Sequence, residues 1–341
     1  SVYSLKVATA KVSDPDYLTL SGGAILEGHD FIAIDLAQPF QNVDSPFAKL
    51  ARIILSRRLA RVGISSTPEQ FFPINEEFKN DLREAEAEAE EEARKIYPSQ
   101  NKKAITDYIY KYARAIYFRK RSPKANRPPY SGLDTIVHIS TGVIRNLLDP
   151  CYWMYDRVYS GQKGKKAQIQ FIPPPIQSEI LLDRSVRLWK RLEDGLDSYI
   201  ENCSTKEARQ IYRLFDNLGI LFRERLLRHK SEPRAIVFTI SSMDEKEKDF
   251  LFPLLDIAKR AQLLYTRNGP AKDDGKREVY YVPNRMLWPV RGLDPNGQHA
   301  RVSLKAADLV AAAKGKKFPQ LLEVSASEQM VSQSELFNET L

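Results

Sequence analysis

One arginine of this sequence, Arg145, has the local surroundings that phosphate recognition requires. It lies in the stretch Ile136–Tyr155, IVHISTGVIRNLLDPCYWMY, three residues after Gly142. The hydroxyl of Ser140 or Thr141 is expected to cap a helix here, and the glycine permits a close turn. In the first turn of that helix, the guanidinium can reach outward to a phosphate. The helix would be held down by apolar residues at helical spacing, namely Val143, Ile144, Leu147 and Leu148.

No other group of residues has the spacing that catalysis or metal binding requires. The four histidines are scattered, no HExxH sequence occurs, and no serine or cysteine lies in a nucleophile elbow. Gly22 and Gly23 are not followed by the lysine and hydroxyl residue of a P-loop, so they do not form a Walker A motif. We therefore expect no catalytic and no metal-binding residue, and no enzyme activity from this chain alone.

The composition favours a soluble protein with an acidic partner. The chain has 341 residues, of which 43% are hydrophobic, and a net charge of +8. This length suits two or three packed units, and the charge favours nucleic acid or nucleotide as a partner. Cys151 and Cys203, each within an expected helix, give no disulfide framework. Without a long apolar run or a signal peptide, we expect a cytoplasmic location and no membrane contact.

The positive charge is concentrated in one part of the chain. Residues 100–170 contain fourteen Lys or Arg and four Asp or Glu. The helix expected over 107–121 interleaves tyrosines with cations, which fits stacking on nucleic acid, although packing of its apolar and aromatic side chains onto the helices that follow, up to residue 172, is favoured. The helix expected over 46–62 carries Arg57, Arg58 and Arg61, which fit either an arginine finger at a subunit interface or, as we favour, a solvated face. The charged segment 76–97 is expected to be an exposed helical arm.

The stretch around Arg145 resembles the sensor 2 region in the lid of AAA+ ATPases of the origin-recognition type. The residues are Ser140-Thr141-Gly142-Val143-Ile144-Arg145-Asn146-Leu147-Leu148, where the family has Ser-Gly-Asp-x-Arg and a leucine pair. Val143 replaces the usual acidic residue. Arg145 matches the arginine that touches the nucleotide in that family, which implies ATP as the cofactor of the full-length protein.

Two further segments resemble parts of bacterial members of the same ATPases. Residues 28–36 are similar to the segment after the sensor 1 strand, which would place Ser1 after the Walker A and Walker B motifs. Residues 280–304 are similar to the closing strand and tail of a winged-helix domain. The order of the matches implies the end of an ATPase core, a lid and a winged helix.

The C-terminal half has the element order of a winged helix. Beyond a stiff connector at Pro173–Pro175, two long helices are expected over 178–203 and 204–229. A strand, a helix and two strands around a polar turn follow in residues 234–290. The candidate nucleic-acid contacts are the cations of this helix and turn, namely Lys259, Arg260, Arg267, Lys272, Lys276 and Arg277. A protein-binding wing remains an equal alternative.

The fold class expected is mainly α with some β: residual α/β core strands, a helical AAA+ lid and a C-terminal winged-helix domain. The expected units are residues 1–100 (end of the ATPase core), 101–172 (lid), 178–322 (helical hairpin and winged helix) and 323–341 (flexible tail). The expected function is an ATP-dependent switch that contacts double-stranded DNA, a partner protein or further copies of itself, in bacterial defence. The alternative is a winged-helix scaffold that is not part of an ATPase.

Overall fold

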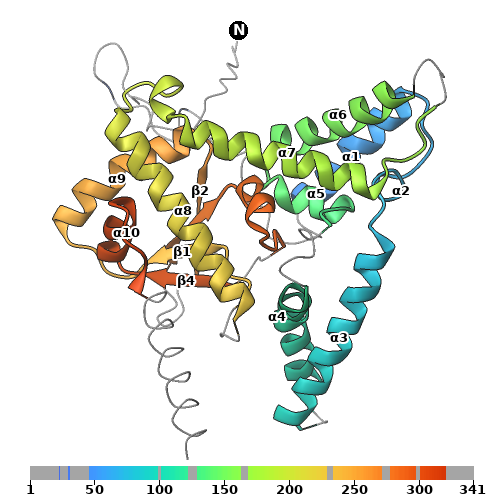
Figure 1. The fold of residues 1–341 in the computed structure, drawn as a ribbon, viewed down its shortest axis with the longest axis horizontal. Coiled ribbons are helices and arrows are strands. Elements are labelled where there is room, and N and C mark those ends of the chain that lie inside the picture. Colours follow the sequence, from blue (N-terminus) through green and yellow to red (C-terminus); the bar gives the residue numbers. More distant parts are fainter. Residues whose placement is uncertain are drawn as a thin grey trace, which may run out of the picture.

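The computed structural model forms helices along most of the chain and one small sheet towards its C-terminal end (Figure 1). It describes Gly23, Asp30 and residues 46–98, 101–121, 129–162, 168–228, 233–270, 277–296 and 300–319. The strands expected within residues 1–36 and the tail expected over 323–341 lie outside these described residues. The expected fold class, mainly α with some β, is confirmed.

A first helical group is built around one hydrophobic core. It contains α1 (Pro46–Arg61), α2 (Pro68–Phe71), α5 (Leu133–Ile139), α6 (Ile144–Gly161) and the first half of α7 (Pro174–Glu193). The helix expected over 46–62 is confirmed as α1, and Ala51, Leu55 and Leu59, which recur every four residues, are buried on one side. Leu50 and Ile53, which were expected on its apolar face, are exposed. Leu147 and Met154 of α6 are fully buried in the same core.

Helices α3 (Glu76–Ile96) and α4 (Lys102–Lys120) form a hairpin that projects from the rest of the molecule (Figure 1). Ala85, Ala89 and Ala93 form a buried stripe on α3, and their small side chains permit close approach of α4. The aromatic residues of α4 pack, as expected, but on α3 and α8 rather than on the first helical group. In one such contact, the ring of Phe78 on α3 packs against the ring of Tyr117 on α4, with the two centroids 4.9 Å apart.

The segment expected to be a stiff connector begins a helix instead. Pro174 occupies the first position of α7, where a missing N–H leaves no hydrogen bond unmade. The helix ends at Glu193, ten residues earlier than expected, because Gly195 adopts a φ of 106° that a helix cannot contain. A short 3₁₀ turn, η1 (Leu196–Ser198), and a loop follow, so Cys203 lies outside any helix. The capped helix expected after it is confirmed as α8 (Thr205–Leu227).

The sheet contains β1 (Val237–Ile240), β2 (Leu264–Pro270), β3 (Arg277–Pro283) and β4 (Arg301–Leu304), in the order β2-β3-β1-β4. The pairs β2–β3 and β1–β3 are antiparallel, and β1–β4 is parallel. Helix α9 (Glu245–Arg260) connects β1 to β2, as expected, and α10 (Ala306–Ala313) follows β4. Two 3₁₀ turns, η2 (Arg285–Leu287) and η3 (Pro289–Arg291), lie between β3 and β4.

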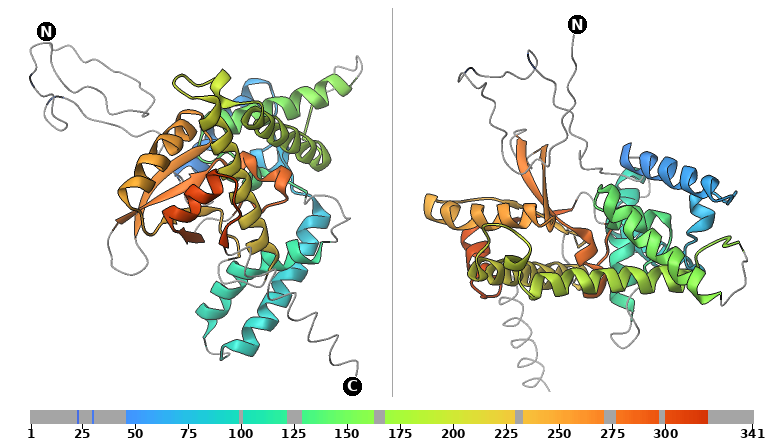
Figure 2. Two further views of the ribbon diagram at one scale, coloured as in Figure 1. Left: turned by 60° about the vertical axis from the view of Figure 1, so that its left-hand side comes forward. Right: turned by 90° about the horizontal axis from the view of Figure 1, so that it is seen from above.

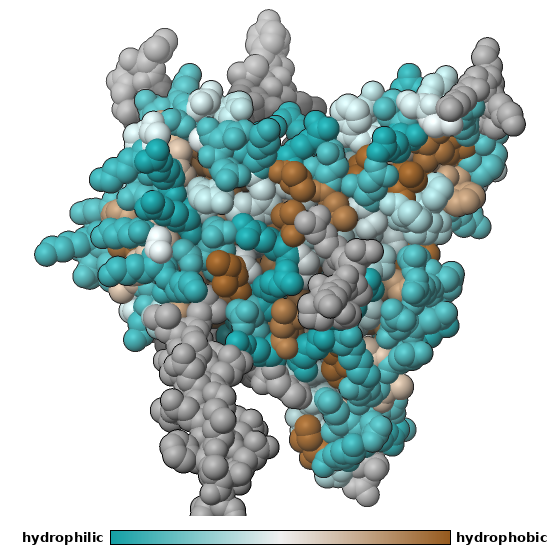
Figure 3. All heavy atoms as spheres, in the orientation of Figure 1, coloured by the Kyte–Doolittle hydropathy of each residue, from teal (hydrophilic) through white to brown (hydrophobic). Residues whose placement is uncertain are grey.

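A second hydrophobic core joins this sheet to helices α8, α9 and α10 and to the α3–α4 hairpin. We call residues 205–319 the sheet unit. Helix α7 contributes to both cores, because Leu181 lies in the first core and Trp189 in the second. Helix α7 therefore ties the first helical group to the sheet unit. The surface drawn in Figure 3 is mostly hydrophilic, with apolar side chains in small separate groups.

Candidate functional site: the α5–α6 turn and the cations of the sheet unit

The turn between α5 and α6 has two successive residues with positive φ. Thr141 has a φ of 55° and Gly142 a φ of 76°. The expected glycine turn is therefore present, but the expected hydroxyl cap is not. Ser140 Oγ donates to the Val137 carbonyl at 2.6 Å and Thr141 Oγ1 donates to the Ile139 carbonyl at 3.1 Å, so both hydroxyls bond back to α5. The residue before α6 is Val143, which makes no side-chain cap.

Arg145 lies in the first turn of α6, as expected, and its side chain is exposed. Within the described part of the chain it has no ion-pair or hydrogen-bond partner. Leu147, two residues later, is fully buried and anchors the same turn. The arrangement presents an unengaged guanidinium beside a helix N-terminus without a side-chain cap, and both features attract an anion.

Two residues of the sheet unit are hydrogen-bonded to the α5–α6 turn and to the first turn of α6. The backbone N–H of Arg285 in η2 donates to Thr141 Oγ1 at 2.9 Å. The side-chain amide of Asn146, next to Arg145, donates to the hydroxyl of Tyr265 in β2 at 3.4 Å. The α5–α6 turn therefore contacts η2, and the first turn of α6 contacts β2.

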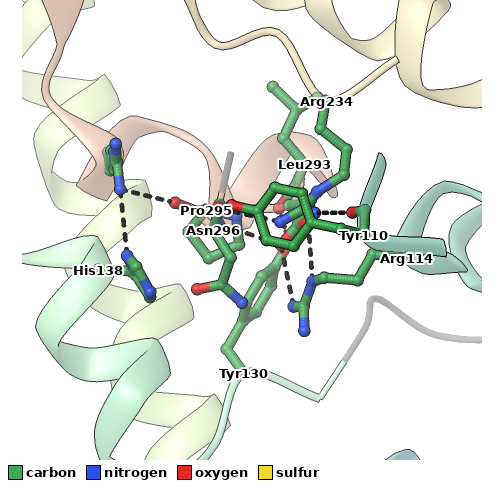
Figure 4. A network of polar contacts seen from close by, with 10 residues as sticks. Tyr110, Arg114, Tyr130, His138, Arg234, Leu293, Pro295 and Asn296 are labelled. Carbon is green, nitrogen blue, oxygen red and sulfur yellow. Dashed lines mark hydrogen bonds and ion pairs between the residues drawn. The ribbon is translucent and has the colours of Figure 1, made fainter. Parts of the chain in front are cut away.

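A buried polar network lies beside this contact (Figure 4). Asp294, only 1% exposed, accepts two hydrogen bonds from Arg114 of α4, at 2.8 and 2.9 Å. Arg234, just before β1, donates to the same carboxylate at 3.0 Å and to the Tyr110 carbonyl at 2.7 Å. One carboxylate therefore connects the α3–α4 hairpin to the sheet unit.

Arg285 extends the network to α5. Its Nη1 donates to the Pro295 carbonyl at 3.1 Å and lies 3.4 Å from Nδ1 of His138 (Figure 4). Burial, reinforced by the Arg285 charge, lowers the pKa of His138 to about 3, so its ring is neutral at pH 7. Burial lowers the pKa of Arg285 to about 10. For Asp294, burial opposes ionisation, but Arg114 and Arg234 outweigh it and hold its pKa well below the usual range.

The candidate phosphate contacts of the sheet unit are mostly engaged or outside the described residues. Arg260 donates to the Glu201 carbonyl at 2.6 Å and lies 3.2 Å from Asp256. Arg267 lies over the ring of Tyr280 at 5.1 Å, and burial lowers its pKa. Lys259 is half-buried on α9. The structure does not describe Lys272, Lys276 or the side chain of Arg277, so these six cations are not brought into one described cluster.

No local pattern in the sequence points to the residues that connect the parts of the molecule. Arg114 and Asp294 are 180 positions apart, and no periodic pattern relates them. Asp294 lies in a loop, and an acidic residue in a loop is too common to indicate a buried ion pair.

In the part of the chain that the structure describes, no group of three or more His, Cys, Asp or Glu could hold a metal ion. No helix among the same residues has the length and apolar character needed to cross a membrane.

The fold, with its helical group joined to a small mixed sheet, is accompanied by a family match over most of the chain. The model of the ORC-CDC6-like family matches residues 1–97 and residues 73–304. The chain therefore belongs to the ORC-CDC6-like family, and it is related to AAA+ ATPases of the origin-recognition and CDC6 type. No curated protein and no solved structure matches the chain.

Proposed function

We propose that this chain forms the lid and the C-terminal contact unit of an AAA+ ATPase, and that Arg145 binds a phosphate of ATP. In this proposal, the first helical group closes over the nucleotide, and the sheet unit contacts double-stranded DNA or a partner protein in the manner of a winged helix. The resemblance of the sequence to bacterial members of the family extends the proposal to defence against phage or another mobile element.

The exposed position of Arg145 carries the proposal. Arg145 makes no ion pair among the described residues, and it faces outward beside a helix N-terminus that has no side-chain cap. A guanidinium and free backbone N–H groups together suit a phosphate, which offers several acceptor oxygens. Arg145 and the N-terminus of α6 would supply the positive end of the nucleotide site, and the P-loop of the full-length ATPase would supply the other phosphate contacts.

The contacts of the same turn provide a route from nucleotide to partner. Thr141 and Asn146 flank Arg145 and are hydrogen-bonded to Arg285 and Tyr265 of the sheet unit. A change in position of the α6 N-terminus on ATP binding would move these two contacts as well. ATP state would thereby alter the placement of the sheet unit, which is the action of a switch.

ATP turnover by the full-length protein tests the proposal. We expect Arg145→Ala to lower the turnover rate by about tenfold or more, because one charge-assisted contact contributes about 1.5 to 3 kcal/mol. Arg209→Ala is a matched control, because Arg209 is also exposed near the start of a long helix, α8. Turnover at the wild-type rate in the Arg145 variant would return this arginine to an ordinary surface role and favour the scaffold alternative.

A further inference from the structure

Helix α1 differs from every other described α-helix in its charge. Its sixteen residues, PFAKLARIILSRRLAR, include five cations and no Asp or Glu. The other described α-helices each contain at least one carboxylate. Several of them pair opposite charges four residues apart, as Glu90 with Arg94 and Asp183 with Arg187 do. The charge of α1 is therefore not neutralised within the helix.

One of the five cations fixes α1 in place. Arg52 donates from Nε to Glu69 of α2 at 2.8 Å and from Nη2 to Asp134 of α5 at 2.9 Å. These two ion pairs, together with the buried stripe of α1, hold one side of the helix against the first helical group. The opposite side consequently faces outward.

Lys49, Arg57 and Arg61 lie on or beside that outward side, whereas Arg58 is exposed near the end of the helix, on the face of the buried Ala51 and Leu55. Arg57 and Arg61 are four residues apart and therefore neighbours on one face. All four are exposed, and none has a carboxylate partner among the residues that the structure describes: Lys49, Arg57, Arg58 and Arg61. Helix α1 lies at the outside of the molecule in the right-hand view of Figure 2. The result is an accessible strip of positive charge along one helix.

We propose that the outward face of α1 binds the phosphate backbone of double-stranded DNA. This inference rests on the nucleic-acid part of the proposed function and adds a contact on α1 to the one proposed for the sheet unit. Duplex DNA carries one negative charge per about 1.7 Å of axis, which complements a row of unpaired cations. The cations Arg260 and Arg267 of the sheet unit are, in contrast, already engaged.

The chemistry of the α1 face favours a duplex over a single strand. Proteins that bind single strands stack bases on exposed aromatic rings between their cations. The apolar residues exposed on α1 are aliphatic, Leu50 at 39% and Ile53 at 49% exposure, and offer no ring for stacking. Contact with the backbone of a duplex needs only the cations, and such binding is independent of base sequence.

Fluorescence anisotropy of a labelled random-sequence duplex, titrated with the full chain at several salt concentrations, tests the proposal. The variant combines Arg57→Gln, Arg58→Gln and Arg61→Gln. We expect the log-log salt slope to fall by about 2.7, since each phosphate contact contributes about 0.9. The dissociation constant at low salt should rise about tenfold or more.

Two control variants separate charge from general damage. Arg83→Gln, Lys206→Gln and Arg209→Gln together remove the same charge from exposed positions of α3 and α8, and should leave most of the slope in place. Replacing Arg57, Arg58 and Arg61 by lysine keeps the charge and should keep the slope. This second variant also reports on folding, because basic residues in the last turn of α1 favour the helix.

Three results would overturn the inference. If neutralising α1 and neutralising the control positions change the slope equally, DNA binding stands but α1 is not its site. If the wild-type chain shows no salt-dependent binding to the duplex, the DNA part of the proposed function fails as well. If the chain binds polyglutamate but no duplex, α1 is a surface for an acidic protein. None of these results bears on the binding of ATP at Arg145.

Discussion

Asp294 is the residue on which the buried contacts between the α3–α4 hairpin and the sheet unit converge. We predict that Asp294→Asn lowers the free energy of unfolding by about 3 kcal/mol, because it removes the carboxylate that pairs with the buried Arg234 and with the partly buried Arg114. Urea unfolding followed by circular dichroism measures this change. Asp249→Asn, at an exposed position of α9, should change the free energy by less than about 0.5 kcal/mol.

The depressed pKa of Asp294 sets the pH range in which this contribution acts. A carboxyl group with a lowered pKa in the folded state contributes its stability above its unfolded pKa and loses it as the pH falls below that value. The difference in stability between wild type and Asp294→Asn should therefore persist from pH 7 to about pH 5 and shrink only in stronger acid. A difference that already vanishes near pH 6 would contradict the assignment of this carboxylate.

Residue-level reasoning from the sequence located Arg145 but not its surroundings. The glycine and the leucines that follow it predicted the turn and the start of α6, because both signals are local. One of the hydroxyls of Ser140 and Thr141 was expected at the helix cap, but α5 ends immediately before them and its carbonyls accept their hydrogen bonds instead. Contacts such as Thr141 with Arg285 depend on how distant segments meet, which local patterns do not encode.

The alanine stripe of α3 gives a prediction about an element. Ala89 is fully buried against α4, whereas Ala87 is exposed on the same helix. We predict that Ala89→Leu lowers the free energy of unfolding by about 1 to 3 kcal/mol, because the larger side chain forces the two helices apart. Ala87→Leu adds the same side chain without that cost and serves as the control. Equal stabilities of the two variants in thermal or urea unfolding would show that the hairpin is not packed this way.

At the level of elements, long periodic segments were predicted well and boundaries less well. Helix α3 follows from its run of strong helix formers, α8 from its amphipathic pattern and serine cap, and the β2–β3 hairpin from the polar turn between its strands. The prolines at 173–175 were expected to form a connector, since proline interrupts a helix, but it is tolerated in the first helical turn. The partner of α4 was missed, because an amphipathic pattern shows that a face is buried without showing against what.

At the scale of the whole molecule, the structure joins its parts through α7, the Asp294 network and the α5–α6 turn. Helix α7 lies in both hydrophobic cores, and the polar contacts of Thr141 and Asn146 connect α6 to the sheet unit. Membership of the ORC-CDC6-like family relates this assembly to nucleotide-dependent proteins. We infer that the three connections together would let a nucleotide bound near α6 influence the surfaces that meet a partner.

The most direct test of this account is the affinity of the full-length protein for ATP, measured by isothermal titration calorimetry with a non-hydrolysable analogue. If Arg145 binds a phosphate, Arg145→Ala should raise the dissociation constant by about tenfold or more, since the lost contact contributes about 1.5 to 3 kcal/mol. Arg209→Ala should bind with wild-type affinity. Equal dissociation constants for wild type and the Arg145 variant would contradict the assignment of this arginine to the nucleotide.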